Sequence, residues 1–456
     1  MKEYVERILR QVMEAGLQVH PSLLKLLESS DIHQLIRYSH LIKAVIREKK
    51  MTRDEQLVLT ADDIIKYTRM EEKEPVNVRF NVIYDVSHSL NPLEDYSDLF
   101  LDRYKKMLDL WYSRPISKRV SDIKFVIRSR ISKPRRIAGL VTKKITKEGR
   151  FIIGVEDPTG RIDVEIPYDL LSKMENILLD SFVIMDVERG GRGFMAKDFW
   201  CLDIPSKEMK RIKDELYVAV TSDLHLGKEG FVEDLFSDMI EWFVKMDDRT
   251  SKRVCCLIIN GDVVDIYAHE KGEVKASYLK LLTYLKQLPD SIIKVIIPGE
   301  CDATRPALPQ PSIFSSYIEQ IPIPNLYLLG NPSMISINTI KFLLFHGQSL
   351  VDVSSQIPSI DKRNVAKLGR ILLKLRHLAP TYGGDTPIAP EKEDLLVIKE
   401  VPDVFILGHM HMGSEDFYKN TIILSLPSWL KDDEAWPGRL ALINLSTMEI
   451  DWKFLE

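Results

Sequence analysis

The stretch Val295-Ile-Ile-Pro-Gly-Glu-Cys-Asp-Ala-Thr-Arg305 decides how the C-terminal half of this chain is expected to fold. It begins as an apolar run that is typical of a buried strand, and it breaks at a Pro-Gly pair. Three reactive side chains, Glu300, Cys301 and Asp302, follow directly. Open α/β sheets present functional groups in this way, just beyond the carboxyl end of a strand.

Four other segments of the same kind lie at long spacings along the chain. Each places an acid or a histidine after a strand-like run, and they are Asp223-Leu-His225, Gly261-Asp262, His346-Gly347 and Gly408-His409-Met-His411. From Tyr217 onward, strand-like runs alternate with helical ones, which predicts an α/β-layered domain over residues 215–456. We expect its strand ends to gather these side chains. His269 and His377 fall outside the pattern, and we expect both on the surface.

Carboxylate oxygens and imidazole nitrogens in one site suit Mn²⁺, Fe or Zn²⁺ better than Mg²⁺ or Ca²⁺. Two such ions about 3.5–4 Å apart would hold a bridging hydroxide and clamp a phosphoryl group for in-line attack. Asp262 is single and stands in the middle of the set, so it is the expected bridging carboxylate. The pattern predicts a two-metal phosphoesterase site.

The overall composition is that of a globular protein with more than one domain. The chain has 456 residues, of which 45% are hydrophobic and 29% charged, and its net charge of −4 creates no global attraction for nucleic acid. It contains no apolar run near the ~18 residues that cross a bilayer, and its start does not resemble a secretion signal. Four irregularly spaced cysteines indicate reduced thiols. We expect a cytoplasmic protein with no membrane contact.

Residues 1–66 have helical periodicity and predict a small helical module that docks to a partner or a neighbouring domain. Within it, Thr60-Ala-Asp-Asp63 resembles a capping box. Residues 67–134 are interpreted as a linker followed by a basic helical segment. Residues 101–150 hold sixteen Lys and Arg against four Asp and Glu, a net of about +12. This surplus favours contact with a phosphate backbone, with Lys143 and Lys144 as expected contacts, although a solvated surface is the alternative.

Residues 135–204 contain four runs of strand length separated by glycine-rich turns, with one short helical run between the third and the fourth. This pattern predicts an OB-fold, a small barrel that often binds single-stranded nucleic acid. A protein partner is the alternative use of its binding face. The expected fold class is therefore multidomain: a helical module, a β-barrel and an α/β phosphoesterase-like domain.

The order Asp-x-His-x-Gly, Gly-Asp-x-x-Asp, Pro-Gly-x-x-Asp, His-Gly and Gly-His-x-His resembles that of the calcineurin-like metallophosphoesterase superfamily. The resemblance becomes more specific with Pro298-Gly-Glu-Cys-Asp-Ala-Thr-Arg-Pro-Ala-Leu-Pro-Gln-Pro311 and with Ile137-Ala-Gly-Leu-Val and Glu156-Asp-Pro-Thr-Gly in the predicted barrel. With these segments and the helical N-terminus, essentially the whole chain resembles the small subunits of archaeal family-D DNA polymerases.

That resemblance implies a 3′→5′ exonuclease that proofreads the primer 3′ end of DNA for a large catalytic subunit, in a heterodimer or larger assembly. A sliding clamp is a further expected partner, and two divalent ions, with Mn²⁺ first, are the expected cofactors. Carried over by position, one metal would be held by Asp223, His225, Asp262 and His411, and the other by Asp262, Glu300, His346 and His409.

The chain departs from the family at two positions of the central loop. The family's Pro-Gly-Asn-His-Asp supplies Asn as a ligand and His as a catalytic proton donor, whereas Glu300 and Cys301 stand there in this chain. Glu adds a negative charge beside a phosphate, and a thiol does not deliver a proton as an imidazolium does. Loss of a general acid costs about 10²–10⁴ in rate, so we expect metal binding with weak or absent exonuclease activity.

Two other functions compete with this one. The first is an inactive structural subunit that bridges the large subunit and DNA, but six of the usual ligands are present, which a long-abandoned site would not be expected to keep. The second is a free-standing phosphodiesterase acting on nucleotides, which the predicted barrel and the basic segment disfavour.

Overall fold

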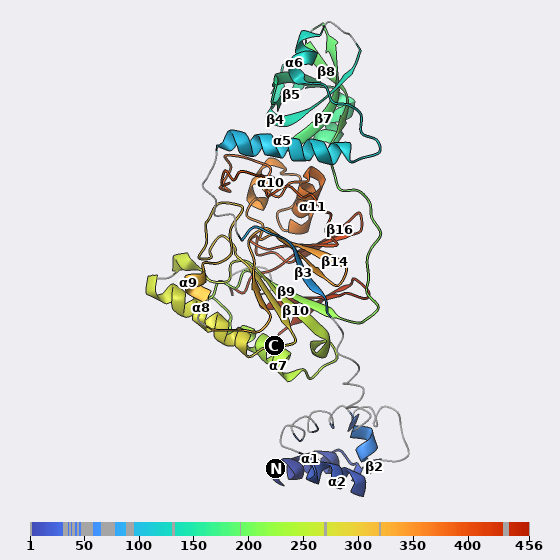
Figure 1. Ribbon diagram of the computed structural model, residues 1–456, viewed down its shortest axis with the longest axis vertical. Helices are drawn as coiled ribbons and strands as arrows, with labels where there is room; N and C mark the ends of the chain where they lie inside the picture. Colours follow the sequence, from blue (N-terminus) through green and yellow to red (C-terminus); the bar gives the residue numbers. More distant parts are fainter. Residues whose placement is uncertain are drawn as a thin grey trace. The chain divides into compact units, whose positions relative to one another are not determined.

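The computed structural model describes residues 2–30, 58–64, 78–87, 95–129, 133–191, 193–268, 271–318, 321–431 and 437–455, together with residues 35, 38, 42, 45 and 46. The chain forms two compact units, Met1–Val78 and Arg79–Glu456, and each is described by itself (Figure 1).

The N-terminal unit contains the helices α1 (Lys2–Glu14) and α2 (Pro21–Glu28) and a short parallel pair of strands, β1 (Gln18–Val19) and β2 (Val58–Leu59). It has its own apolar core, in which Ile8, Leu23 and Leu59 are fully buried. The predicted capping box is confirmed: the Thr60 backbone N–H donates to Oδ2 of Asp63 at 2.8 Å, and the Asp63 N–H donates to Oγ1 of Thr60 at 3.3 Å. Most of the helical pattern predicted for 31–57, and residues 65–77, lie outside the described residues.

Two six-stranded sheets form the body of the second unit (Figure 1). The first has the order β12-β11-β10-β9-β18-β19, and its strands are β9 (Tyr217–Thr221), β10 (Val254–Asn260), β11 (Ile293–Ile297), β12 (Leu326–Leu328), β18 (Arg439–Asn444) and β19 (Ile450–Phe454). Strands β9 to β12 are parallel. Every residue of β9, β10 and β11 is buried, which is why these strands are almost wholly apolar in sequence.

The second sheet has the order β16-β17-β15-β14-β13-β3. Its strands are β3 (Phe80–Asp85), β13 (Ser333–Ile337), β14 (Ile340–Leu344), β15 (Val404–Leu407), β16 (Ser414–Tyr418) and β17 (Thr421–Ser425). Strands β14, β15 and β17 are parallel, so their carboxyl ends point the same way. The remaining strands pair antiparallel.

Helices cover both sheets. The first sheet shares one core with α7 (Glu233–Lys245), α8 (Lys271–Lys286) and the short α9 (Ser315–Ile318). The second packs against α10 (Leu350–Gln356) and α11 (Val365–Leu375), and Figure 1 shows these two helices between the sheets and the barrel. The predicted α/β-layered architecture is therefore confirmed. None of the described helices is long and apolar enough to cross a membrane.

Five strands close into a barrel in the order β4-β5-β6-β8-β7. They are β4 (Arg135–Lys147), β5 (Arg150–Asp157), β6 (Gly160–Ile166), β7 (Phe182–Gly190) and β8 (Gly193–Trp200), with a 3-10 helix, η1 (Tyr168–Met174), between β6 and β7. The two strands β4 and β5 approach closely at Gly139, where a Cβ atom would lie 2.3 Å from the carbonyl oxygen of Glu156. The glycine-punctuated pattern predicts four of these strands and the helical turn in this place, but it does not predict the fifth strand, β8.

The interpretation of residues 67–134 as a linker followed by a basic helical segment misses one strand in its first part, whereas its second part contains two helices. Strand β3 (Phe80–Asp85) pairs antiparallel with β13 and forms one edge of the second sheet. The helix α5 (Tyr96–Tyr112) follows, capped by Asp95, whose side chain accepts from the Ser97 N–H at 3.0 Å. A further helix, α6 (Ile123–Arg128), packs against the barrel strand β6. The polar, proline-containing sequence concealed β3 because its partner strand β13 lies far away in the chain.

Helix α5 is anchored by a buried cluster of charged and polar groups. Nε of Arg103 lies 2.6 Å from Oδ2 of Asp394, and both side chains are 1% exposed. Nε2 of His377 lies 2.9 Å from the same carboxylate oxygen, and Nδ1 of His377 accepts from the Ala379 N–H at 3.0 Å. The expectation that His377 lies on the surface is therefore wrong. Its partners are remote in sequence, so its burial has no local signal. His269, for which we made the same prediction, lies outside the described residues.

Candidate metal centre

The strand ends of both sheets meet at one place. Asp223 and His225 follow β9, Asp262 follows β10, and the loop that carries Glu300 and Cys301 follows β11. From the second sheet, His346 follows β14, and His409 and His411 follow β15. Because these strands are parallel within each sheet, their carboxyl ends lie on one edge. Hydrogen bonds connect the two edges, because the backbone N–H of His409 donates to both carboxylate oxygens of Asp223 at 3.1 Å.

The first group of converging side chains comprises Asp223, His225 and His411, whose ligand atoms lie within 4.8 Å of one another. The two Nε2 atoms of His225 and His411 are only 3.1 Å apart. Nε2 of His411 also lies 3.5 Å from Oδ1 of Asp223. Asp223 and His225 are buried, while His411 is about a quarter exposed. Two imidazoles and a carboxylate that converge in this way can share one cation.

The second group comprises Asp262, His346 and His409, again within 4.8 Å. Nε2 of His346 lies 3.2 Å from Oδ2 of Asp262, and the same carboxylate oxygen lies 3.7 Å from Nε2 of His225 in the first group. Asp262 therefore stands between the two groups. This is the position that a carboxylate shared by two metals would take.

His346 gives a test of whether cations fit here. Its Nδ1 bonds to the carbonyl oxygen of Asn260 at 2.9 Å, so the Nδ1–H donates and Nε2 carries the lone pair in the neutral ring. Nε2 is buried and has no hydrogen-bond partner among the described residues. Burial alone would lower the pKa of His346, but Asp262 and Asp223 outweigh burial and raise it to about 10. The carboxylates of Asp262 and Asp223 therefore favour a positive charge at this position, and either a proton or a divalent cation can supply it.

His409 behaves in the opposite way. Burial, reinforced by the charge of His346, lowers the pKa of His409 to about 4. It is therefore neutral near pH 7 and has a lone pair available for a metal. Burial would raise the pKa of Asp262, but His346 and His225 hold it well below its usual range, so this side chain is a carboxylate. The donor set as a whole fits divalent cations.

Backbone strain is present at the same positions. Five of the seven predicted ligands have a left-handed backbone, with φ of 53° at Asp223, 49° at His225, 50° at Asp262, 66° at His409 and 56° at His411. Such a conformation costs a residue with a side chain roughly 1–2 kcal/mol. Strain of this kind persists where the surrounding structure imposes it, and it clusters at functional sites. Residue types alone do not reveal it.

Glu300 does not join either group. Its side chain is 51% exposed, and its Oε2 lies 3.6 Å from Nδ1 of His409. Burial, followed by the negative charge of Asp262, raises the pKa of Glu300. Glu300 is thus placed beside the second group rather than in it.

Cys301 lies close to Asp262 and His225. Its Sγ forms a third group with His225 and Asp262, within 4.8 Å. Its backbone N–H donates to Oδ1 of Asp262 at 2.7 Å. Burial and the charge of Asp262 raise the pKa of the Cys301 thiol well above its usual range in the metal-free protein. The thiol is therefore protonated and is a poor proton donor near neutral pH.

Two acids near the site have roles that the sequence pattern did not assign. Oδ2 of Asp265 lies 3.4 Å from Nδ1 of His225 and orients that ring, and the spacing Gly-Asp-x-x-Asp was the available signal. Asp302 closes the central loop by accepting backbone N–H bonds from Gly299, Val263 and Val264. Burial, with the charge of Asp262, raises the pKa of Asp302 to about 6. Its oxygens are occupied by the loop itself.

A buried amide network holds the central loop from behind. Nε2 of Gln310 donates to the carbonyl oxygen of Gly299 at 2.9 Å. Oε1 of Gln310 accepts from Asn331 and from Gln348, each at 2.7 Å. Oδ1 of Asn331 accepts from the His346 N–H at 3.1 Å, which links the loop to a ligand of the second group. This explains the Pro-Gln-Pro segment, because Gln310 connects the loop to the second sheet.

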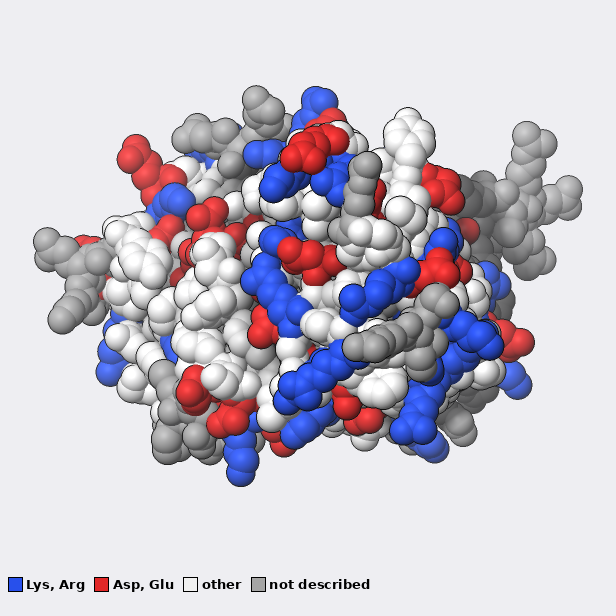
Figure 2. All heavy atoms as spheres, turned by 90° about the horizontal axis from the view of Figure 1, so that it is seen from above, with Lys and Arg blue, Asp and Glu red and all other residues white. Residues whose placement is uncertain are grey.

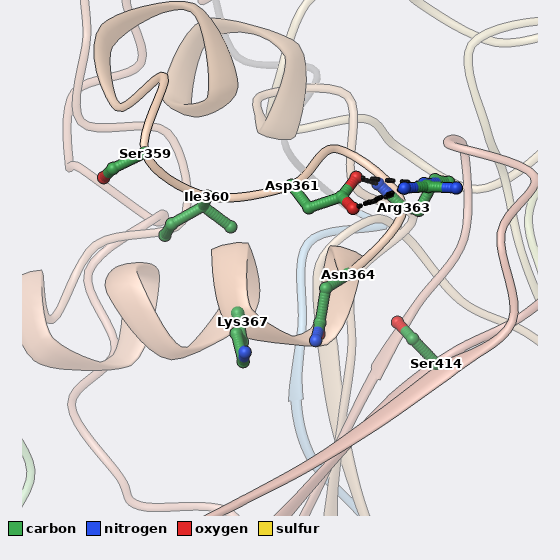
Figure 3. Close-up of a pocket in the computed structure, with 7 residues that line it drawn as sticks. All are labelled: Ser359, Ile360, Asp361, Arg363, Asn364, Lys367 and Ser414. Atoms are coloured by element: carbon green, nitrogen blue, oxygen red, sulfur yellow. Dashed lines mark hydrogen bonds and ion pairs between the residues drawn. The ribbon is translucent and has the colours of Figure 1, made fainter.

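A polar cavity of about 620 Å³ lies beside the first turn of α11, the segment before that helix and the first residue of β16 (Figure 3). It is lined by Ser359, Ile360, Asp361, Arg363, Asn364, Lys367 and Ser414. Ser414 stands three residues after His411, so their Cα atoms are at most about 11 Å apart. Arg363 pairs with Asp361 at 2.9 Å, whereas Lys367 is exposed and has no ion-pair partner among the described residues. Lys367 thus offers this cavity a positive charge that no ion pair among the described residues holds.

The two lysines expected to contact DNA are already engaged. Nζ of Lys143 lies 2.6 Å from Oδ2 of Asp163, and Nζ of Lys144 donates to the Ile177 carbonyl oxygen at 2.6 Å. Burial lowers the pKa of Lys144. Figure 2, which views the molecule from the barrel end, shows lysine and arginine side chains spread over this face with acidic ones between them. The positive surplus of residues 101–150 is therefore partly compensated within the fold.

The chain was compared with solved structures and with a protein-family model. Among solved structures, a phosphoesterase from E. coli aligns with a TM-score of 0.28 and 13% identity over 53% of this chain and 100% of that chain, a likeness too weak to carry an argument. Residues 218–415 match the family model that describes the B subunits of the DNA polymerases alpha and epsilon.

Sequence relatives are more informative. The chain is 34% identical over 386 residues to the DNA polymerase II small subunit of Pyrococcus horikoshii, a match that covers 78% of this chain and 62%, less than two thirds, of that relative. It is 31% identical over 406 residues to the DNA polymerase II small subunit of Methanothermobacter thermautotrophicus, which covers 81% of this chain and 82% of the relative. The resemblance carried by the central loop is thereby confirmed, and the chain belongs to the family of DNA polymerase II small subunits.

Proposed function

We propose that this chain serves an archaeal replicative DNA polymerase as its small subunit and carries a two-metal 3′→5′ exonuclease site of weakened activity. Family membership supports the polymerase context, and with it a large catalytic subunit as partner. The observation that carries the exonuclease proposal is Asp262, a buried carboxylate that faces His346 of one group and His225 of the other. A shared carboxylate between two nitrogen-rich groups is the arrangement that two-metal hydrolysis requires.

Two ion positions follow from the groups. The first position consists of Asp223, His225, Asp262 and His411, and the second of Asp262, His346 and His409 with Glu300 beside it. When bound, two divalent cations, with Mn²⁺ as the expected ion, supply Lewis acidity and the positive charge that stabilises a phosphoryl group in its transition state. The strained backbone holds the ligands in place before any cation arrives, which lowers the cost of ordering them.

The chain's own side chains explain why we expect slow hydrolysis. The departing 3′ oxygen of a DNA strand needs a proton, and the thiol of Cys301, whose pKa is raised, does not provide one efficiently. The Glu300 carboxyl lies 3.6 Å from His409, where a scissile phosphate would approach, and its charge opposes that of the phosphate. Both effects act on the reaction while leaving the metal ligands in place.

Double-stranded or frayed DNA would reach the site through the cavity beside α11, where Lys367 offers a positive charge that no ion pair among the described residues holds. We also infer that the barrel is an OB-fold. The parallel pairing of β6 with β8 and the helical turn between β6 and β7 support this assignment.

An exonuclease assay tests the proposal. The full chain is incubated with Mn²⁺ and a primer bearing a 3′ mismatch, beside a Glu300→Asn, Cys301→His double variant. We expect the double variant to cleave about 10²–10⁴ times faster, because it regains a general acid. Adding Asp262→Ala to the double variant should abolish cleavage. Wild-type cleavage at the rate of the double variant would contradict the weakening, and cleavage that survives Asp262→Ala would contradict the site.

A second candidate function is a structural subunit that binds DNA and the large subunit without hydrolysis. The observation that favours it is the pair of changes in the central loop, since both act against catalysis. It predicts that the double variant remains inactive although its metal content equals that of the wild type.

A further inference from the structure

We propose that Cys301 is a metal ligand, and that its thiolate closes the first position and makes it prefer Zn²⁺ to Mn²⁺. The inference rests on the proposed two-metal site and refines it: it names the ion and explains one cause of weak activity. The residue is not a stand-in for a proton donor but a fifth donor atom.

The backbone fixes Cys301 in a position to reach the cation. Its N–H donates to Oδ1 of Asp262 at 2.7 Å, and its carbonyl oxygen accepts from the Ile266 N–H at 3.0 Å. The next residue, Asp302, is held by three backbone N–H groups. With both sides of the residue anchored, only the side-chain torsion of Cys301 is free to move the sulfur.

The sulfur points to donors that share a cation. Sγ of Cys301, a ring nitrogen of His225 and a carboxylate oxygen of Asp262 lie within 4.8 Å of one another. A thiolate sulfur and an imidazole nitrogen bound to one zinc ion at neighbouring positions lie roughly 3.0–3.7 Å apart, from bond lengths of about 2.3 and 2.0 Å. Because the observed ligand atoms lie no more than 4.8 Å apart, the side chains need to draw together by at most about 1–2 Å.

Independent features of the pocket call for a cation at this point. Asp223 and Asp262 are 0% and 2% exposed, so two carboxylates are buried side by side. Nε2 of His346, which is 0% exposed, is a buried nitrogen with no hydrogen-bond partner among the described residues. Buried polar atoms without partners are costly, and metal coordination is one way in which proteins satisfy them.

The ligand type determines the ion. Soft thiolate ligands select Zn²⁺ over Mn²⁺, whereas a purely oxygen and imidazole set discriminates less between them. Metal binding displaces the thiol proton, which passes to bulk water, so the sulfur binds as a thiolate. Structural zinc sites are closed, while catalytic ones keep a position open for water or substrate. A thiolate in the first position fills the place that water would occupy, and hydrolysis slows.

Cobalt substitution gives a readout that does not depend on activity. The full chain is stripped of metal, loaded with Co²⁺ and examined for the intense near-ultraviolet charge-transfer band of a cobalt–thiolate bond. We expect the band in the wild type and in Cys201→Ala, a control that removes a comparably half-buried thiol elsewhere. It should be absent from Cys301→Ala and from Cys301→Ser. Zn²⁺ affinity of Cys301→Ser should fall by at least about 10–100-fold, with Mn²⁺ affinity changed less.

Each other outcome overturns a defined part of the account. Cobalt binding without the band in the wild type, or a band that survives both Cys301 variants, refutes the thiolate ligand while the two-metal site stands. A wild type that binds no cobalt, zinc or manganese refutes the two-metal site and this inference with it. A thermal melt shows that the variants are folded, and Cys301→Ser keeps the volume and polarity of the side chain if Cys301→Ala does not fold.

Discussion

Replacing Arg103 by methionine should lower the free energy of unfolding of the unit Arg79–Glu456 by about 3–5 kcal/mol, because it leaves a buried charge without its partner. Arg103 lies 2.6 Å from Asp394, and both are 1% exposed. Nη1 of Arg103 also donates to the Pro380 carbonyl oxygen at 2.7 Å, so a second acceptor loses its donor. Lys105→Met, which changes an exposed lysine on the same helix, should cost no more than about 0.5 kcal/mol.

The expected shift in melting temperature follows from the size of the unit. Its roughly 380 residues carry an unfolding entropy of about 0.8 kcal/mol per kelvin, at about 2.1 cal/mol/K for each residue. A loss of 3–5 kcal/mol therefore lowers Tm by about 4–6 °C when the unit unfolds as one. Urea unfolding and calorimetry measure the two quantities separately.

A double substitution distinguishes a lost interaction from a lost volume. Arg103→Met with Asp394→Leu removes both charges, and apolar replacement of a buried ion pair is often neutral or stabilising. We expect this double variant to recover most of the stability that Arg103→Met loses. A single variant no less stable than Lys105→Met, or a double variant less stable than the single one, would refute the reasoning.

Three further predictions follow from other parts of the structure. Gly299→Ala should lower metal affinity by at least about 10-fold, because the added Cβ would lie 2.2 Å from Oδ1 of Asp262. In the control Gly160→Ala the added Cβ meets nothing within 4 Å, so metal titrations should be unchanged. Lys367→Glu should weaken DNA binding and reduce the slope of log affinity against log salt concentration by about 1, whereas Lys286→Glu on α8 should change neither. Equal slopes for the two variants would exclude the cavity as a phosphate contact. Burial, with the charge of Arg103, lowers the pKa of His377, so the contribution of His377 to stability is complete above about pH 6.5 and is lost as the pH falls. The urea midpoint of His377→Gln should therefore depend less on pH between 5 and 7 than that of the wild type.

The parts of this structure that the sequence predicts are those with local signals. Apolar runs such as β10 mark buried strands, and the acids and histidines that follow them lie together because parallel strands share an edge. The capping box at Thr60 and the strand pattern of the barrel are equally local. For the metal centre, the order of the five segments was enough to bring Asp262 to its middle.

The remaining features depend on partners that are remote in the chain. β3 pairs with β13, and Phe80 lies opposite Ile337, so a polar stretch that looks like a linker becomes the edge of a sheet. His377 is buried because Asp394 and Arg103 surround it, and Arg103 is 291 residues from Asp394. Contacts of this kind leave no periodic pattern in the sequence, and the residue types alone do not predict them.

Backbone geometry and hydrogen-bond networks are hidden in the same way. The positive φ at Asp262 is imposed by the turn after β10, and the link from Gln310 through Asn331 to His346 joins three segments. Charge counting also has limits, since Lys143 is paired within the barrel. A surplus of cations in sequence becomes a binding surface only where the fold leaves those cations unpaired.

The bridging role of Asp262 is the central claim, and metal stoichiometry tests it most directly. Metal-free full-length protein is titrated with Mn²⁺ and with Zn²⁺ while bound metal per chain is measured, for the wild type and for two variants. We expect two ions per chain in the wild type, one in His409→Ala, and close to none in Asp262→Ala, because both positions share that carboxylate. Two ions bound by Asp262→Ala, or the loss of only one, would contradict it.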